Sequence, residues 1–150
     1  MKVPTIVCIT VFVLGAMLPV FADTTDSSEK IIPQDKDGNL TLYVSNQSFA
    51  ITPVDITILI DGRKAVIGNF DVKGKRIAQH NWIKHVFTLS PGKHKLKVVS
   101  KKGEAILEKE FSIKGKHWAV VDYWYYPKSH YSPTPRKFRF NIQDKPIQFE

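Results

Sequence analysis

The histidines are the first side chains in which chemistry would be expected, and their spacing argues against a metal site. His80 and His85 are five residues apart, so on one regular strand they point to opposite faces. There is no His-x-His pair, and Cys8 is the only cysteine. We therefore expect no metal and no other cofactor. His94 shares strand parity with apolar neighbours, which predicts a hydrogen-bonded structural histidine near the end of a sheet.

A catalytic nucleophile is equally hard to place. The sequence has no Gly-x-Ser-x-Gly turn, and Ser129 next to His130 is not a triad arrangement. Carboxylates that could pair across a cleft are Asp55, Asp61, Asp71 and Asp122. Asp122 lies on a strand that is apolar on both faces, so we expect it to be solvated at a strand end or buried with backbone partners. These patterns predict that the protein is not an enzyme, and a small hydrolase with paired carboxylates is the alternative.

The strongest chemical signal is an aromatic and basic segment near the C-terminus. Residues 123–140 contain seven aromatic side chains, four Lys or Arg and no acid. Outward-facing rings and cations of this kind suit stacking on a glycan or contact with an anionic polymer. The candidate binding residues are Tyr123, Tyr125, Lys128, Tyr131, Arg136, Lys137 and Arg139. The alternative is that the whole segment is core and loop packing.

Strand alternation divides the aromatic residues between two faces. Trp118, Trp124 and Tyr126 share one face, and Tyr123 and Tyr125 share the other. One set can fill the core, and a buried Trp commonly anchors folds of this type. We expect Tyr123 and Tyr125 to face outward or to lie under the proline-rich loop that follows.

The elements that must position these residues are strands. Period-2 alternation predicts strands over residues 40–44, 54–60, 64–72, 80–89, 93–100, 104–113, 117–126 and 137–142. Turn signals recur about every ten residues, and no stretch has helical periodicity, which is typical of a β-sandwich. We expect an all-β fold, a single antiparallel immunoglobulin-like sandwich of seven or eight strands, with a small β-barrel as the alternative. The short connections favour antiparallel neighbours.

Two hairpins can be predicted in detail. Asp61-Gly62 between apolar runs is a strong hairpin signal because Gly accepts a positive φ. Lys102-Gly103 predicts a second, two-residue turn. In that register the facing pairs are Lys101 with Glu104, Lys97 with Glu108, Lys95 with Glu110, and Val98 with Leu107 on the inward side.

Two segments of this region resemble a known class of module. The segment Ile58-Leu59-Ile60-Asp61-Gly62 is followed about thirty residues later by Leu89-Ser90-Pro91-Gly92-Lys93-His94-Lys95-Leu96-Lys97-Val98. This layout resembles PEGA-type and related immunoglobulin-like or fibronectin-like modules of exported proteins, over about forty residues. The resemblance implies a non-enzymatic spacer or binding domain.

The N-terminal residues predict export. Residues 1–22 carry a single charge at Lys2, an apolar run and small residues before Asp23, which is the pattern of a secretory signal peptide. An uncleaved anchor is the alternative, although the apolar run is short for a membrane span. Residues 23–38 are polar and predict a flexible leader, and residues 39–150 form the domain. We expect a secreted, periplasmic or extracellular protein whose mature chain begins at Asp23 and has no transmembrane segment.

Composition narrows the class of partner. The formal net charge is +8 with 22 Lys and Arg against 14 acids, which favours polyanions and anionic surfaces without specifying a nucleic acid. We therefore expect a secreted binding module for an extracellular or envelope component, such as a glycan, an anionic polymer or a protein partner. The alternative is a structural or interaction module that works through a sheet edge. The sequon at Asn46 indicates a surface turn.

Overall fold

The computed structural model describes residues 30–72, 81–128 and 132–149, and every regular element in these ranges is a β-strand. The predicted signal peptide, the predicted leader as far as residue 29, and Tyr131 lie outside the described residues. The strands are β1 (Leu40–Asn46), β2 (Val54–Ile60), β3 (Arg63–Phe70), β4 (Ile83–Phe87), β5 (Gly92–Ser100), β6 (Ala105–Ile113), β7 (His117–Tyr126) and β8 (Thr134–Gln143).

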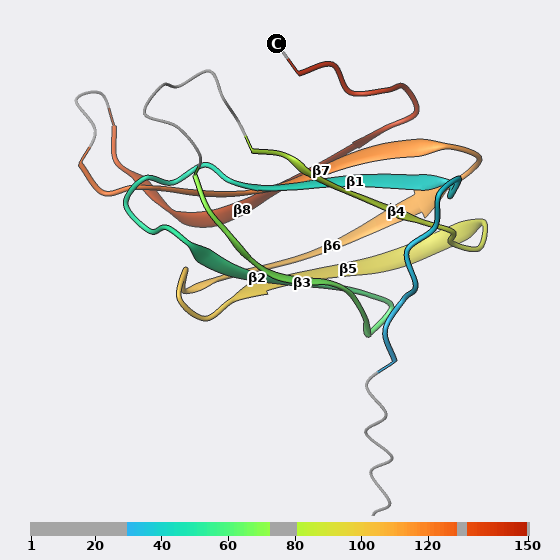
Figure 1. Ribbon diagram of the computed structural model, residues 1–150, viewed down its shortest axis with the longest axis horizontal. Coiled ribbons are helices and arrows are strands. Elements are labelled where there is room, and N and C mark those ends of the chain that lie inside the picture. Colours follow the sequence, from blue (N-terminus) through green and yellow to red (C-terminus); the bar gives the residue numbers. More distant parts are fainter. Residues whose placement is uncertain (1–29, 73–80, 129–131, 150) are drawn as a thin grey trace, which may run out of the picture.

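The strands form two stacked four-stranded sheets, as Figure 1 shows. One sheet has the order β4-β1-β7-β8 and the other β3-β2-β5-β6. The predicted β-sandwich is confirmed, and the two sheets do not close into the alternative barrel. Alternation explains the layering, because Val54, Ile56, Ile58 and Ile60 of β2 are all buried between the sheets. Burying each such side chain contributes about 1.5–3 kcal/mol.

Both predicted hairpins are present. Asp61 and Gly62 have φ angles of 51° and 74°, as a two-residue turn with left-handed positions requires. Between β5 and β6, Lys97 faces Glu108, Lys95 faces Glu110 and Val98 faces Leu107, so the predicted register is confirmed.

The second turn differs from the prediction in its details. The positive φ lies at Glu104 (45°) instead of Gly103, and the Glu104 carboxylate forms an ion pair with Arg136 on β8. Gly103 is required for another reason. A Cβ atom there would lie 2.8 Å from the ring of Tyr123, so only glycine lets this turn approach the opposite sheet.

One strand pair contradicts the expectation of antiparallel neighbours. β1 pairs with β7 in parallel, with Leu40 opposite His117 and Asn46 opposite Tyr123. The argument from short connections applies only to strands that follow one another in the chain. β1 and β7 are separated by the whole of the second sheet, so the path between them is long enough for a parallel crossover.

The end of the predicted leader belongs to the fold. Ile32 is only 5% exposed, and its amide donates to the Lys64 carbonyl on β3. Three residues later, the Asp35 amide donates to the Val86 carbonyl on β4, and the Asp35 carboxylate accepts from Thr88. Residues 30–38, here called the clasp, therefore link the two sheets on the side where β3 and β4 are the edge strands (Figure 1). The prediction of a flexible leader is wrong for this part.

The sequon does not mark a surface turn. Asn46 is 3% exposed, and its amide nitrogen donates to the carbonyls of Ile51 and Phe70. Its side-chain oxygen accepts from the Ser48 amide. The folded domain therefore keeps this amide inaccessible to glycosylation.

Candidate functional site

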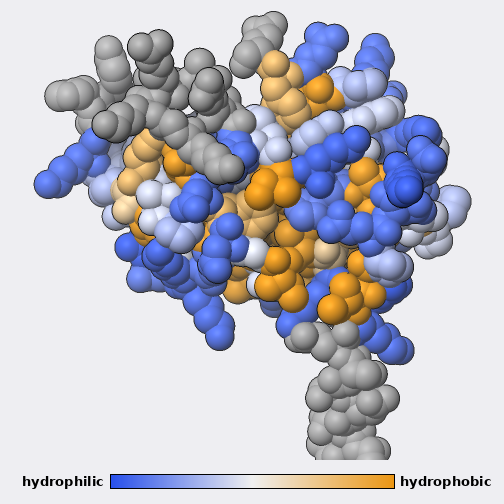
Figure 2. Space-filling model, viewed as in Figure 1, coloured by the Kyte–Doolittle hydropathy of each residue, from blue (hydrophilic) through white to orange (hydrophobic). Residues whose placement is uncertain are grey.

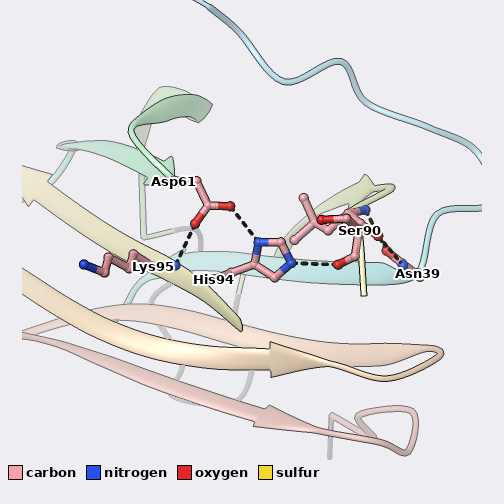
Figure 3. A network of polar contacts seen from close by, with 6 residues as sticks. Asn39, Asp61, Ser90, His94 and Lys95 are labelled. Atoms are coloured by element: carbon pink, nitrogen blue, oxygen red, sulfur yellow. Dashed lines mark hydrogen bonds and ion pairs between the residues drawn. The ribbon is translucent and has the colours of Figure 1, made fainter. Parts of the chain in front are cut away.

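A histidine–carboxylate pair at one end of the sandwich is the first arrangement to test for chemistry (Figure 3). Nδ1 of His94 lies 2.6 Å from the Asp61 carboxylate, and Nε2 lies 2.8 Å from the Ser90 carbonyl. The second Asp61 oxygen accepts from the Lys95 amide. Both imidazole nitrogens therefore face acceptors, which favours the doubly protonated ring.

The electrostatics of this pair are those of a structural contact. Burial alone lowers the pKa of His94, but the hydrogen bonds to Asp61 and Ser90 and the Asp61 charge outweigh it, so the pKa is raised. Burial alone raises the pKa of Asp61, but its bonds to His94 and Lys95 and the nearby cations lower it. Because both ring nitrogens are engaged, His94 has no free nitrogen to act as a base. The predicted structural role of His94 is confirmed.

Two absences complete the search for chemistry. Within residues 30–72, 81–128 and 132–149, no three His, Cys, Asp or Glu side chains are grouped closely enough to hold a metal ion. In the same part of the chain, no helix has the length and apolar character needed to cross a membrane.

The predicted aromatic site is divided by the alternation of β7. Tyr123 is fully buried, and its hydroxyl donates to the Gly103 carbonyl at 2.8 Å. Burial raises the pKa of this hydroxyl. Tyr123 is therefore not the outward ring of the predicted binding site, and its burial fits the alternative in which this segment packs into the core. Trp124 and Tyr126 lie on the opposite face of β7 and are only partly buried.

A second pair of predicted residues lies with Tyr123 on the inner side. The guanidinium of Arg136 lies 4.9 Å from the centre of the Tyr125 ring and forms an ion pair with Glu104. These contacts connect β8 to the β5–β6 turn at the edge of the sandwich. Since its charge is paired and its planar face rests on a ring, Arg136 serves packing between the sheets.

The outward face of β7 and β8 retains the other part of the predicted site. Arg139 is exposed, and its guanidinium lies 4.3 Å from the centre of the Trp124 ring. Lys137 pairs directly with Trp124 across the strands and shares the outward parity of Arg139. Tyr126 lies next to Trp124, with ring centroids 5.9 Å apart. We call Trp124, Tyr126, Lys137 and Arg139 the outer cluster.

Hydrogen bonds from the segment that follows β1 hold this end of β7 in place. The Ser48 hydroxyl donates to the Tyr125 carbonyl at 2.7 Å, and the Gln47 amide donates to the Tyr123 carbonyl at 2.8 Å. The Tyr126 hydroxyl donates to the Gln47 carbonyl. The outer cluster therefore stands on a backbone that the end of β1 keeps rigid.

A hollow of about 230 Å³ adjoins the outer cluster. Its lining residues are Val120, Asp122, Arg139, Asn141, Gln143 and Ile147. Ile147 comes from the C-terminal segment, which turns back over the sheet where Gln143 donates to the Lys145 carbonyl. Farther along, Phe149 stacks on Trp82 with centroids 4.8 Å apart. Arg139 thus lines the hollow and also contacts the Trp124 ring.

A larger hollow of about 360 Å³ lies on the outer face of the second sheet, beside Leu59. Its charged walls include Lys97 and Glu108, which form an ion pair at 2.9 Å. It contains none of the aromatic side chains of the outer cluster, so the outer cluster and its adjoining hollow remain the better candidate.

Of the predicted site residues, the structure brings together Lys137 and Arg139 on the outer face. It places Tyr123, Tyr125 and Arg136 on the inner side. Lys128 is exposed just beyond the end of β7. Sequence reasoning missed Trp124 and Tyr126 as outward residues, and it missed the polar row Asn141 and Gln143. The continued alternation beyond Arg139 was the signal that could have found this row.

Comparisons of the chain with models of known protein families, with curated proteins and with solved structures gave no significant match.

Proposed function

We propose that the protein is a secreted, non-enzymatic binding module that holds an anionic polymer against the outer face of β7 and β8. The observation that carries this proposal is the Arg139 guanidinium lying 4.3 Å from the centre of the Trp124 ring, with Lys137 directly opposite Trp124 on the paired strand. A net charge of +8 adds a long-range attraction for such a polymer.

The stacked arginine supports an anion as the ligand. A guanidinium that lies on an aromatic ring keeps its N–H groups at its edges, in a fork that matches carboxylate, sulfate or phosphate oxygens. The ring also restricts the side chain before binding, which reduces the entropy lost when the anion arrives. Lys137 supplies a second cation two residues away on the same face of β8.

The proposal is tested by removing the two cations of the outer cluster. We expect the mature protein to bind polygalacturonate, heparin and long-chain polyphosphate at low salt, and less tightly as the salt concentration rises. The double variant Lys137→Gln/Arg139→Gln should lose at least roughly tenfold in affinity, because charge-assisted hydrogen bonds contribute about 1.5–3 kcal/mol each. Isothermal titration calorimetry at two salt concentrations measures this.

The matched control is Lys109→Gln/Lys114→Gln, which removes the same charge from exposed positions on and next to β6. It should change affinity by less than about threefold, the effect of long-range charge alone. Equal losses in both double variants would show that net charge, and no particular surface, attracts the polymer. If none of the polymers binds, the proposed function is wrong.

Export is a separate part of the proposal, and it rests on the pattern of residues 1–22. Intact-mass measurement of the protein produced in its own cells should give a chain that begins at Asp23. A mass that retains residues 1–22 would remove this part and leave the surface proposal standing.

A protein partner is the second candidate, and one observation favours it. Hydrophobic side chains gather on the side where β3 and β4 are the edge strands (Figure 2), and Ile67 and Ile83 on these strands are 59% and 37% exposed. Exposed hydrophobic side chains that gather on one side are typical of interaction surfaces. Sedimentation velocity of the wild type and of Ile67→Ser/Ile83→Ser tests it: self-association that the double variant abolishes would support this candidate, and a monomer in both would count against a second copy as the partner.

A further inference from the structure

We infer that the anionic polymer is an acidic polysaccharide, and that the hollow beside Arg139 holds one of its sugar residues. This inference rests on the proposed function, because it assigns the ligand class of the same surface. It follows from the kinds of polar side chain that line the hollow and from their order along β7 and β8.

The polar side chains form a regular row. Arg139, Asn141 and Gln143 alternate along β8, so all three share its outward face. On β7, Asp122 lies directly opposite Arg139, and Val120 lies opposite Asn141. The backbone of two paired strands therefore fixes the spacing of the polar groups, which is the condition for a preformed site.

The row mixes donors and acceptors in a way that suits hydroxyl groups. The Arg139 guanidinium only donates, and the amide of Asn141 carries both a donor and an acceptor. A sugar hydroxyl can satisfy each of these because it both donates and accepts. A polyphosphate oxygen only accepts, so it would leave the acceptor oxygen of the Asn141 amide without a donor.

The size and the apolar lining of the hollow also suit a sugar residue. The hollow of about 230 Å³ is smaller than the roughly 300–1,000 Å³ of sites for drug-sized ligands, so it accommodates one small unit of a chain. Val120 and Ile147 give it apolar walls, against which the C–H groups of a sugar ring can pack.

The position of Arg139 allows one ligand to place a sugar in the hollow and an anionic group beside the guanidinium. Its guanidinium borders the hollow and also lies against Trp124, so it is the cation nearest to a sugar bound there. A carboxylate or sulfate on that sugar, or on the next one along, then reaches the guanidinium while the hydroxyls meet the amide of Asn141. An acidic polysaccharide provides both kinds of group on one chain.

The test uses Asn141→Ala, which removes a neutral, exposed amide and leaves every charge in place. The probes are polygalacturonate, hyaluronate and heparin as acidic polysaccharides and long-chain polyphosphate as the polyanion without sugar. We expect Asn141→Ala to weaken at least one of the polysaccharides by roughly threefold to tenfold, the effect of one or two hydrogen bonds, and to leave polyphosphate unchanged. Asn69→Ala, an exposed Asn on β3 of the other sheet, should change neither.

The outcomes separate the two proposals. If polyphosphate binds but none of the polysaccharides does, or if Asn141→Ala changes no polysaccharide affinity, the sugar assignment is wrong while the anionic surface stands. If neither kind of polymer binds, the proposed function itself fails. Chemical shift changes at Val120 and Asn141 on adding the polysaccharide that binds most tightly check the location independently, and shifts confined to other strands would overturn it.

Discussion

The Arg139 guanidinium lies 4.3 Å from the centre of the Trp124 ring, diagonally across the ladder that joins β7 to β8. The contact lies on the outer side of the sheet, away from the core that Tyr123 fills. A cation held over a ring at an exposed site contributes about 0.5–1 kcal/mol, which is enough to bias the arginine toward one orientation.

Replacing the ring should weaken polymer binding without removing any charge. We expect Trp124→Leu to lower the affinity for the anionic polymer roughly twofold to fivefold, because Arg139 loses its support. Trp118→Leu, on the same face of β7 but at its other end, is the control and should bind as the wild type does. Calorimetric titration at low salt measures both, and equal affinities for the two variants would contradict a role for the stack.

Removing the buried Tyr123 hydroxyl should measurably lower the free energy of unfolding. Tyr123→Phe deletes the hydroxyl that donates to the Gly103 carbonyl and leaves this carbonyl without that bond in a buried place. We expect a loss of about 1–3 kcal/mol in the free energy of unfolding. In the control Tyr43→Phe, the ring is only partly buried and stability should change by less than about 0.5 kcal/mol. Urea denaturation compares the two, and similar losses would mean that the Tyr123 bond contributes nothing specific.

Alanine substitutions at the two adjacent isoleucines of the clasp should lower the stability by different amounts. Ile32 is 5% exposed, so Ile32→Ala should destabilise the protein by about 2–5 kcal/mol. Ile31 is 62% exposed, and Ile31→Ala should cost less than about 0.5 kcal/mol. Thermal and urea unfolding measure the difference. A small effect at both positions would show that the clasp does not take part in the cooperative fold.

His94 should stabilise the fold most strongly on the acid side of neutrality. Its pKa in the folded state is raised above the ordinary value of 6.5, so its contribution is complete below about pH 6.5 and is lost as the pH rises through the folded-state pKa. Asp61→Asn removes the charge that supports the imidazolium and should flatten this part of the profile. The free energy of unfolding measured between pH 5.5 and 9 checks the prediction, and an unchanged profile in the variant would contradict it.

His85 should lower the stability of the fold at acid pH, which is opposite to the effect of His94. Burial lowers its pKa below 6.5, and among the described residues neither buried ring nitrogen has a hydrogen-bond partner. The neutral form is therefore favoured in the folded state, and stability should fall as the pH drops below about 6.5. His85→Phe should reduce this acid sensitivity relative to the wild type. Chemical denaturation at pH 5 and pH 7.5 compares them, and equal acid sensitivity of the wild type and His85→Phe would refute the assignment.

Local patterns were sufficient to predict the sandwich and the register of its clearest hairpin. The alternation in β2 identifies its buried face because that face is apolar throughout, whereas the other face carries Asp55 and Thr57 beside Leu59. The charges of Lys97 and Glu108 select one register, since a slip of one residue would place each side chain on the wrong face. The parallel pairing of β1 with β7 depends on contacts between distant segments, which no short pattern contains.

The candidate site was predictable only in part, because both faces of β7 carry aromatic side chains. Alternation groups Tyr123 with Tyr125 and Trp124 with Tyr126, but it does not say which group is buried. The deciding contact is the one between Tyr123 and Gly103, and Gly103 belongs to a turn of the other sheet. The burial of Asn46 has the same kind of cause, since one of its partners is the Phe70 carbonyl at the end of β3.

The clasp also determines how the domain would respond to mechanical load. A pull on the chain before Lys30 acts first on the hydrogen bonds between the clasp and Lys64, and then on those that join Asp35 to β4. Because these bonds are loaded one after the other, the clasp would detach from β3 and then from β4 before either sheet loses a strand. Ile32 would leave the core first, so early yielding would open the side of the sandwich where β3 and β4 lie, with the outer cluster on β7 and β8 still intact.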